Sequence, residues 1–242
     1  AHATNTAYSL EYRVRSYLQA NCSQCHFPGG PTPAAWDARI GTPLSAAGIV
    51  NGSLANPMGD PTNAVAKPGS LTNSMLHRRI SVRGAGQMPP LGSTVIDTQG
   101  VTLVAAWITG ALTNYQTFAE WQMVHFGSTN APEAQPEADS DLDGTPNYLE
   151  FLTGKIPTNE ASAWGVGGLE TSNGFPEVIF ERVANRGFDV QVATNLLEPD
   201  WSSLDTPANQ PYFSAASETV AVGDTAATNS GERFYRVGVR EP

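Results

Sequence analysis

The chain contains only two cysteines, and both belong to the run Cys22-Ser23-Gln24-Cys25-His26. Two thiols at this spacing lie on one side of a helical turn, where each can form a thioether bond with a vinyl group of haem. The adjacent imidazole of His26 can then reach the iron. The run therefore predicts the covalent attachment of one c-type haem.

A CxxC pair can also be a redox disulfide or one half of a zinc site. A redox disulfide is expected in a βαβ context, and a zinc site needs a second pair of Cys or His residues. The chain has no cysteine besides Cys22 and Cys25, and it has no second closely spaced pair of Cys or His residues. We therefore favour haem over both alternatives.

An electron carrier needs a second permanent axial ligand, whereas an enzyme that binds oxygen or peroxide needs an open position. We expect the sulfur of Met88 as this ligand. Prolines hold its segment, residues 84–92, extended, and glycines let the backbone approach a flat macrocycle. Met58, which also lies in a turn-rich loop, is the second choice. The remaining candidates are Met75, Met123, His2, His77 and His125.

Two amphipathic helices are expected to hold this site. The apolar residues of the first, which runs from about Tyr8 into the cysteines, recur with helical spacing at Leu10, Val14, Tyr17 and Leu18. The second is predicted to begin at Asp97 or Thr98 and to continue to about Leu112. We expect Trp107, on the apolar stripe of the second helix, to be a packing residue rather than a catalytic one.

Residues 139–150 match the calcium-loop pattern D-x-D-x-D-G-x5-E at every specified position. The alternative is a solvated acidic linker. Such a linker would not require Gly144 at position six or Glu150 at position twelve of the pattern. Pro146 cannot donate the backbone N–H that joins paired EF-hand loops, so we expect a solitary loop that holds one calcium ion and stiffens a junction. The expected ligands are Asp139, Asp141, Asp143, the carbonyl of Thr145, Asn147 and both oxygens of Glu150.

After residue 160, apolar and polar residues begin to alternate, which is the period-two pattern of β-strands. Nearly alternating residues over 177–183, 188–192 and 234–240 predict strands separated by turns, typical of a small antiparallel sandwich. We expect a haem domain over 1–115, a junction over 116–158 with a helix at 118–126 and the calcium loop, and an accessory β domain over 159–242. The rings of Trp164, Trp201 and Tyr212 could stack on sugars or belong to its core.

The net charge of −10 argues against nucleic acid as a partner. Residues 1–115 contain seven Lys and Arg against four Asp and Glu, whereas residues 116–242 contain six against 19, which gives +3 and −13. This reversal supports two distinct halves. Arg78, Arg79 and Arg83 could pair with haem propionates or face an acidic partner. No apolar run is long enough to span a bilayer, and we expect any export signal to have been removed.

Residues from about Tyr8 to Leu112 resemble a class I cytochrome c, with an N-terminal helix, the CxxCH run, a methionine loop and a C-terminal helix. The stretch 78–92 is similar to cytochrome c domains of large secreted bacterial proteins, where they often follow a quinoprotein sugar dehydrogenase-like propeller. The resemblance implies covalent haem with His26 and Met88 as axial ligands, and the transfer of single electrons. The calcium loop resembles those of dockerin and thrombospondin type 3 repeats.

We therefore expect a multi-domain protein: an all-α class I cytochrome c domain, a short calcium-loop and helix junction, and an antiparallel β-sandwich-like domain. It would be an electron carrier rather than an enzyme. As a bacterial protein exported to the periplasm or beyond, it would accept electrons from a redox partner or a fused dehydrogenase. Two alternatives stay open. One is a haem peroxidase or gas-binding protein with an open sixth position. The other is a calcium-dependent adhesion or glycan-binding module.

Overall fold

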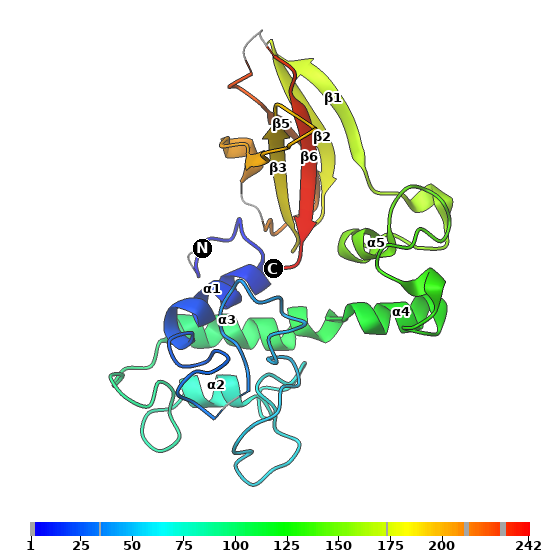
Figure 1. Ribbon diagram of the computed structural model, residues 1–242. Coiled ribbons are helices and arrows are strands. Elements are labelled where there is room, and N and C mark those ends of the chain that lie inside the picture. Colours follow the sequence, from blue (N-terminus) through cyan, green and yellow to red (C-terminus); the bar gives the residue numbers. More distant parts are fainter. Residues whose placement is uncertain (1–2, 34, 173, 211–212, 228–230) are drawn as a thin grey trace. The chain divides into compact units, whose positions relative to one another are not determined.

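A computed structural model describes residues 3–33, 35–172, 174–210, 213–227 and 231–242 (Figure 1). The chain forms two compact units, Ala1–Tyr115 and Gln116–Glu241. Each unit has its own buried apolar cluster. They are therefore described separately.

The described residues of the first unit form three α-helices: α1 (Leu10–Cys22), α2 (Met75–Ile80) and α3 (Thr98–Thr109). The side chain of Ser9 caps α1, and that of Asp97 caps α3 by accepting from the backbone N–H of Gly100 at 3.0 Å. Both helices expected from periodicity are confirmed. The second ends at Thr109 rather than near Leu112, and a 3₁₀ turn, Ala111–Asn114, follows Gly110.

The expected fold class is wrong. Between α1 and α2 the described residues form no helix, and their pairing consists of isolated bridges such as Val50 with Ala66 and Ala64 with Ser74. Prolines and left-handed glycines, among them Gly48 at φ 63°, prevent helices in this segment. The second unit combines short helices with two antiparallel sheets. The chain is therefore a mixed α and β protein without an all-α cytochrome c domain.

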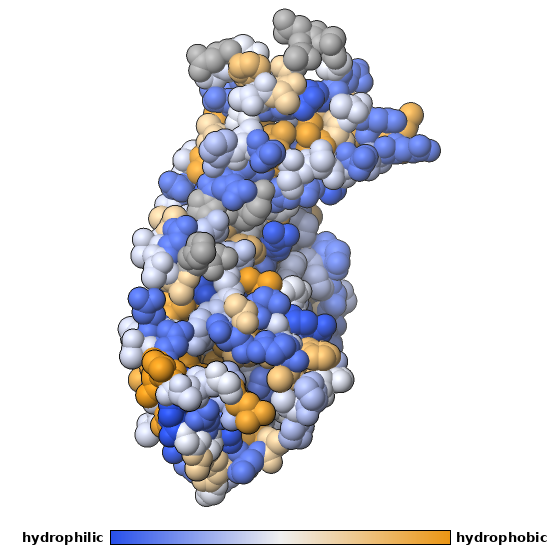
Figure 2. All heavy atoms as spheres, turned by 90° about the vertical axis from the view of Figure 1, so that its left-hand side faces the viewer, coloured by the Kyte–Doolittle hydropathy of each residue, from blue (hydrophilic) through white to orange (hydrophobic). Residues whose placement is uncertain are grey.

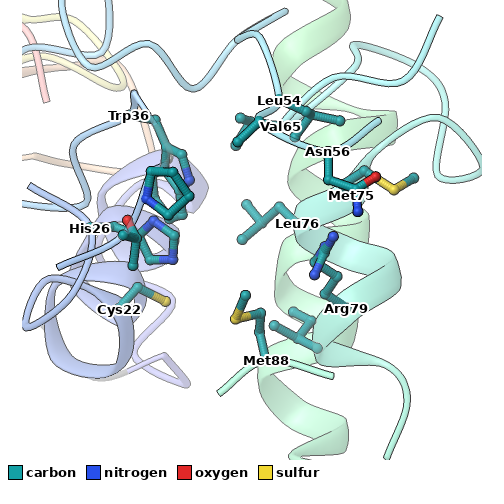
Figure 3. A pocket seen from close by; sticks show the side chains of 14 residues that line it. Cys22, His26, Trp36, Leu54, Asn56, Val65, Met75, Leu76, Arg79 and Met88 are labelled. Atoms are coloured by element: carbon teal, nitrogen blue, oxygen red, sulfur yellow. The ribbon is translucent and has the colours of Figure 1, made fainter. Parts of the chain in front are cut away.

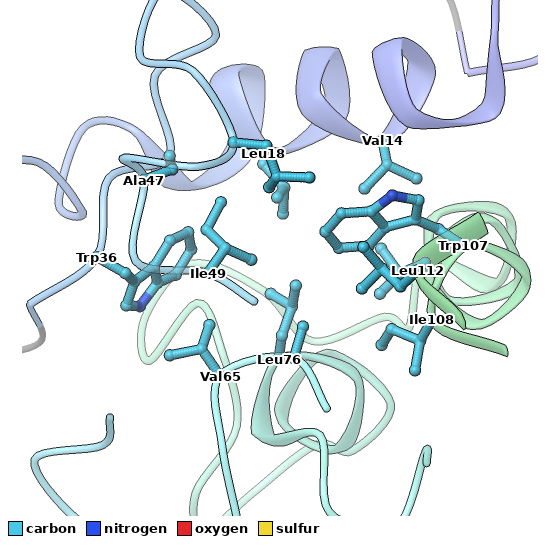
Figure 4. Packing of buried hydrophobic residues seen from close by; sticks show 14 of the residues in the cluster. Val14, Leu18, Trp36, Ala47, Ile49, Val65, Leu76, Trp107, Ile108 and Leu112 are labelled. Carbon is cyan, nitrogen blue, oxygen red and sulfur yellow. The ribbon is translucent and has the colours of Figure 1, made fainter. Parts of the chain in front are cut away.

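The core of the first unit lies between α1, α3 and the loops. Trp107 is fully buried, so its expected packing role is confirmed. It lies in one apolar cluster with Val14 and Leu18 of α1 (Figure 4). Loop residues complete this cluster, which includes Trp36, Ala47, Ile49 and Val65. Loops thus supply apolar surface that helices supply in an all-α core.

The crossing of α1 and α3 depends on one glycine. A Cβ atom at Gly100 would lie 2.4 Å from Cζ of Tyr17 and 2.5 Å from its hydroxyl oxygen. The ring of Tyr17 therefore occupies the space that any side chain at position 100 would need. This close contact brings the beginning of α3 against α1.

The second unit contains two three-stranded antiparallel sheets. One has the order β1-β2-β5, with β1 (Val166–Ser172), β2 (Phe175–Arg182) and β5 (Glu218–Gly223). The other has the order β4-β3-β6, with β4 (Ser202–Ser203), β3 (Gly187–Ala193) and β6 (Phe234–Arg240). The strands expected at 177–183, 188–192 and 234–240 correspond to β2, β3 and β6.

One apolar cluster joins the two sheets. Phe180 of β2 stacks on Phe188 of β3 with their ring centroids 5.7 Å apart. The ring of Trp164 lies against both and is 9% exposed. The buried positions of β3 alternate at Phe188, Val190 and Val192, which explains why this strand could be read from the sequence.

Two α-helices belong to the same unit, α4 (Phe118–Phe126) and α5 (Asn147–Thr153). Thr117 and Glu120 form a capping box at the start of α4, and the left-handed Gly127 ends it, so the helix expected at 118–126 is confirmed. Trp121 of α4 packs against Phe151 of α5. Short 3₁₀ turns complete the unit at Pro132–Ala134, Glu160–Ser162 and Pro207–Asn209.

None of the helices in the described part of the chain is long and apolar enough to cross a bilayer. On the face drawn in Figure 2, apolar residues form small groups separated by polar ones. Exposed apolar side chains such as Leu91 and Leu197 lie far apart in the sequence.

Gly100→Ala should lower the free energy of unfolding by about 1–3 kcal/mol, because the added methyl group overlaps the ring of Tyr17. In a Tyr17→Ser background the same change should be neutral or stabilising by up to about 1 kcal/mol, because alanine favours helix over glycine. Urea denaturation of the four proteins in this cycle measures both effects. If Gly100→Ala lowered the free energy of unfolding equally in the parent and in the Tyr17→Ser background, the contact between Gly100 and the Tyr17 ring would be contradicted.

Candidate functional site

Cys22, His26 and Met88 line one cavity of about 330 Å³ in the first unit. A second cavity of about 360 Å³ shares these three residues and adds Cys25. Figure 3 shows Cys22, His26 and Trp36 along one side of the first cavity, with Met88 across from them. The structure thus brings together all four residues expected to hold haem.

The end of α1 positions both thiols and the imidazole. The carbonyl of Cys22 accepts from the backbone N–H of Cys25 at 3.1 Å and from that of His26 at 2.9 Å. Burial, and next the nearby Cys25, raises the pKa of the Cys22 thiol to about 12. A redox CxxC pair instead lowers a thiol pKa to form thiolate. A neutral Cys22 thiol is therefore unlike the activated thiolate of a redox pair.

His26 lies in a dry, apolar setting. Its ring stacks on that of Trp36, with the centroids 4.2 Å apart and the planes at 23°. Burial lowers the pKa of His26, so the imidazole stays neutral, which is the form that binds a metal. Its Nδ1 is buried without a hydrogen-bond partner among the described residues.

The side chain of Gln87 closes the loop that carries Met88 on itself. Gln87 accepts from the backbone N–H of Gly84 at 2.6 Å and donates to the carbonyls of Pro89 at 3.0 Å and Ser93 at 3.1 Å. The backbone N–H of Met88 donates to the carbonyl of Arg79 on α2 at 2.9 Å. The loop therefore presents Met88 to the cavity from a fixed backbone.

The three arginines near this loop do different things. Arg83 donates to the carbonyls of Val95, Ile80 and Val82, so it ties the methionine loop to the chain ahead of α3. Arg79 lines the first cavity. Arg78 is exposed and does not line either cavity. Arg79 and Arg83 therefore each border a cavity, whereas Arg78 borders neither.

The other candidate ligands are less well placed. Met75 lines the first cavity, but its side chain extends away from His26 in Figure 3. Met58 is 48% exposed and lines neither cavity. His77 lies half-buried on α2 beside the hydroxyl of Ser81. Met123 and His125 belong to α4 in the second unit, and His2 lies outside the described residues.

The calcium loop holds three carboxylates close together. Oxygens of Asp139, Asp141 and Asp143 lie within 4.8 Å of one another, and one oxygen of each is buried without a hydrogen-bond partner. The opposite oxygen of each accepts a backbone N–H of the loop, for example that of Gly144 on Asp139 at 2.9 Å. Such backbone bonds hold the free oxygens toward a common centre.

Glu150 and Asn147 of α5 complete this cluster. Glu150 is fully buried, and neither carboxylate oxygen has a hydrogen-bond partner. Burial first, and then Asp141, Asp143 and Asp139, raises its pKa to about 7. The amide of Asn147 donates to the carbonyls of Glu133 and Gln135, which leaves its Oδ1 buried without a hydrogen-bond partner.

Thr145 connects this loop to the sheets. Its hydroxyl donates to the carbonyl of Trp164 and accepts from the Trp164 backbone N–H, both at 3.3 Å. The indole N–H of Trp164 donates in turn to the carbonyl of Glu181 on β2 at 2.9 Å. The calcium loop and the sheet core therefore share a buried residue. The expected ligand role of the Thr145 carbonyl stays a prediction.

Sequence reasoning missed Trp36, Gln87 and the bracing role of Arg83. Trp36 lies in a proline- and glycine-rich segment without helical or strand periodicity, so no pattern marked it as a contact of His26. Gln87 stands next to the expected ligand and could have been examined as a turn residue. Its three contacts depend on the path of the loop, which sequence spacing does not specify.

Comparison with protein-family models, curated proteins and solved structures finds no match to this chain. The assignment of its chemistry therefore rests on the arrangement of its own residues. That arrangement consists of a cavity with two thiols, an imidazole and a thioether, and of a loop with convergent carboxylate oxygens.

Asp37 braces the segment that contacts His26. The buried carboxylate of Asp37 accepts two hydrogen bonds from Arg39, from Nε at 3.0 Å and from Nη2 at 2.8 Å. It accepts a third from the hydroxyl of Thr42 at 2.7 Å. These bonds hold the pKa of Asp37 well below its usual range, with the Arg39 hydrogen bond as the largest cause. The charged form is therefore the one that stabilises the fold.

Asp37→Asn should lower the free energy of unfolding at pH 7 by about 1–3 kcal/mol, because hydrogen bonds to a charged acceptor are lost. The pKa of Asp37 is lower in the folded protein than in the unfolded chain. Its charged form therefore contributes fully to the free energy of unfolding above the ordinary carboxyl pKa of about 4, and this contribution decreases as the pH falls below that value. The difference from the parent should therefore shrink in strong acid. Urea denaturation at pH 7 and pH 3 measures this, with Asp200→Asn, at an exposed aspartate, as the control.

Proposed function

We propose that this chain is a c-type haem protein that transfers single electrons. Cys22 and Cys25 would attach the haem, and His26 and Met88 would bind its iron. The observation that carries the proposal is that all four residues, from the end of α1 and from a distant loop, border the second cavity, and that Cys22, His26 and Met88 also border the first. The run Cys22-Ser23-Gln24-Cys25-His26, with the spacing of a c-type haem attachment site, supports it.

The chemistry of the lining fits this group. Cys22 is a neutral thiol suited to a thioether, and His26 is a neutral imidazole. The remaining lining of the first cavity is largely apolar and includes Leu54, Val65, Leu76 and Ile80. Such side chains exclude water and suit the faces of a flat macrocycle.

When bound, the haem supplies one-electron exchange as its iron alternates between the ferrous and ferric states. The neutral thioether of Met88 would favour the ferrous state more than a second imidazole would, and so raise the reduction potential. A methionine that lines the cavity opposite His26 also argues against a peroxidase or gas-binding protein with an open sixth position. On this proposal the chain is an electron carrier rather than an enzyme.

We propose that the protein acts outside the cytoplasm, in the bacterial periplasm or beyond, where millimolar calcium could occupy a single weak loop. Its electron donor would be a redox partner protein or a fused dehydrogenase domain. The acidic net charge makes nucleic acid an unsuitable partner.

The glycan-binding alternative receives no support from the aromatic residues that suggested it. Trp164 is buried in the core of the second unit. The guanidinium of Arg236 lies 4.4 Å from the ring centroid of Trp201 and covers one of its faces. Tyr212 lies outside the described residues.

Met88→Ala should convert a low-spin, six-coordinate haem into a high-spin one that binds carbon monoxide, because the sulfur ligand is lost. Absorption and electron paramagnetic resonance spectra of the matured protein measure this change. Met58→Ala, at an exposed methionine that lines neither cavity, is the matched control.

Mass spectrometry of the parent protein tests the attachment itself, and the expected mass exceeds that of the polypeptide by one haem. A bare polypeptide with two free thiols would refute the proposal. A high-spin parent spectrum would instead retain the haem and reject Met88 as its ligand.

We further propose that residues 139–150 hold one calcium ion. The fit rests on six buried oxygens without hydrogen-bond partners, which belong to Asp139, Asp141, Asp143, Asn147 and, as a pair, Glu150. Carboxylate and amide oxygens are the ligands that calcium prefers, and a buried acidic cluster without a cation is electrostatically unfavourable. The left-handed Gly144, at φ 90°, makes the sharp turn.

Glu150→Gln should weaken calcium binding by at least about tenfold, because the bidentate carboxylate at position twelve is lost. Glu137→Gln removes a nearby exposed carboxylate outside the loop and should leave the affinity unchanged. Isothermal titration calorimetry measures both, and calcium should raise the melting temperature of the parent and of the control. Equal affinities in the two variants would exclude Glu150 as a ligand.

A further inference from the structure

A histidine that binds a metal is normally oriented by a hydrogen bond from its other ring nitrogen to a carboxylate, a carbonyl or water. His26 departs from this rule. Its Nδ1 is buried, and no group in the described parts of the chain accepts a hydrogen bond from it. Among the described protein groups, it is therefore packing rather than a hydrogen bond that can set the plane of this imidazole.

Trp36 lies in contact with the ring. The centroids are 4.2 Å apart and the planes are inclined by only 23°, so the indole covers a face of the imidazole. Trp36 is 7% exposed and borders the same cavity as His26. It also belongs to the apolar cluster with Ile49 and Val65 (Figure 4), so it is packed against both the core and His26.

The backbone on either side of this contact is fixed as well. The carbonyl of His26 accepts from the backbone N–H of Ala38 at 2.9 Å, and the carbonyl of Ala47 accepts from that of Asp37 at 2.8 Å. A Cβ atom at Gly48, which has φ 63°, would lie 2.9 Å from the carbonyl oxygen of Ala35. The segment of Trp36 is thus held between the His26 segment and residues 47–48.

We propose that Trp36 is a positioning residue that fixes the imidazole plane of His26 by ring stacking, in place of the usual hydrogen bond. This inference rests on the proposed function, in which His26 binds the haem iron. An imidazole whose second nitrogen has no acceptor donates less electron density to the metal. The stacked indole, by keeping Nδ1 dry, therefore favours the ferrous state.

The test compares Trp36→Phe, which keeps an aromatic face, with Trp36→Leu and the more flexible Trp36→Met, which do not. Trp107→Leu is the matched control, because Trp107 is fully buried in the same cluster and lines neither cavity. Proton nuclear magnetic resonance of the oxidised haem protein reports the imidazole plane through the pattern of haem methyl shifts. Electrochemical titration reports the midpoint potential.

Trp36→Leu and Trp36→Met should both rearrange the methyl shifts and lower the potential, because water reaches Nδ1 and the ring can turn. Trp36→Phe should keep the haem methyl shifts and the midpoint potential close to those of the parent. Trp107→Leu should lower the stability without changing the shifts or the potential. Methyl shifts and potentials in Trp36→Met that match the parent would overturn the proposal, even if Trp36→Leu failed to fold. Failure of the proposed function would appear separately, as a parent protein without covalent haem.

Discussion

The end of α1 is the constraint on which the rest of the haem proposal depends. One carbonyl, that of Cys22, accepts the backbone N–H groups of both Cys25 and His26. This bonding keeps the residues on a single turn, so that Cys22 and His26 border both cavities and Cys25 borders one. Because the turn leaves the thiols and the imidazole little freedom, the other segments need only form the opposite wall and exclude water.

That opposite wall is made from α2 and from loops, and polar side chains hold the loops in position. Gln87 closes the methionine loop on itself, Arg83 ties it to the chain ahead of α3, and Asp37 braces the turn behind Trp36. Each of these groups is satisfied by backbone atoms or by a charged neighbour, so it costs little to bury in part. In the first unit, these side-chain hydrogen bonds hold the loops in positions that helices would occupy in an all-α domain.

The sequence predicted the features whose determinants are close together in the chain. Caps and spacing located α1, α3 and α4, and alternation located β2, β3 and β6. The calcium loop could be read because all its expected ligands lie within twelve residues. The path of residues 23–74 and the contact of Trp36 with His26 could not be predicted, because they depend on where distant segments meet. The strands β1 and β5 were missed, since their exposed residues do not alternate with buried ones.

The two hydrogen bonds between Thr145 and Trp164 limit where the chain can be cut into separately folding fragments. Trp164 belongs to the core shared by the two sheets, whereas Thr145 belongs to the loop that precedes α5. A truncation between residues 158 and 159 would leave the Trp164 backbone without its partner and uncover the indole. The loop, α5 and the sheets should therefore open and close together as a single cooperative element, and expression of the sheets alone would yield an incomplete one.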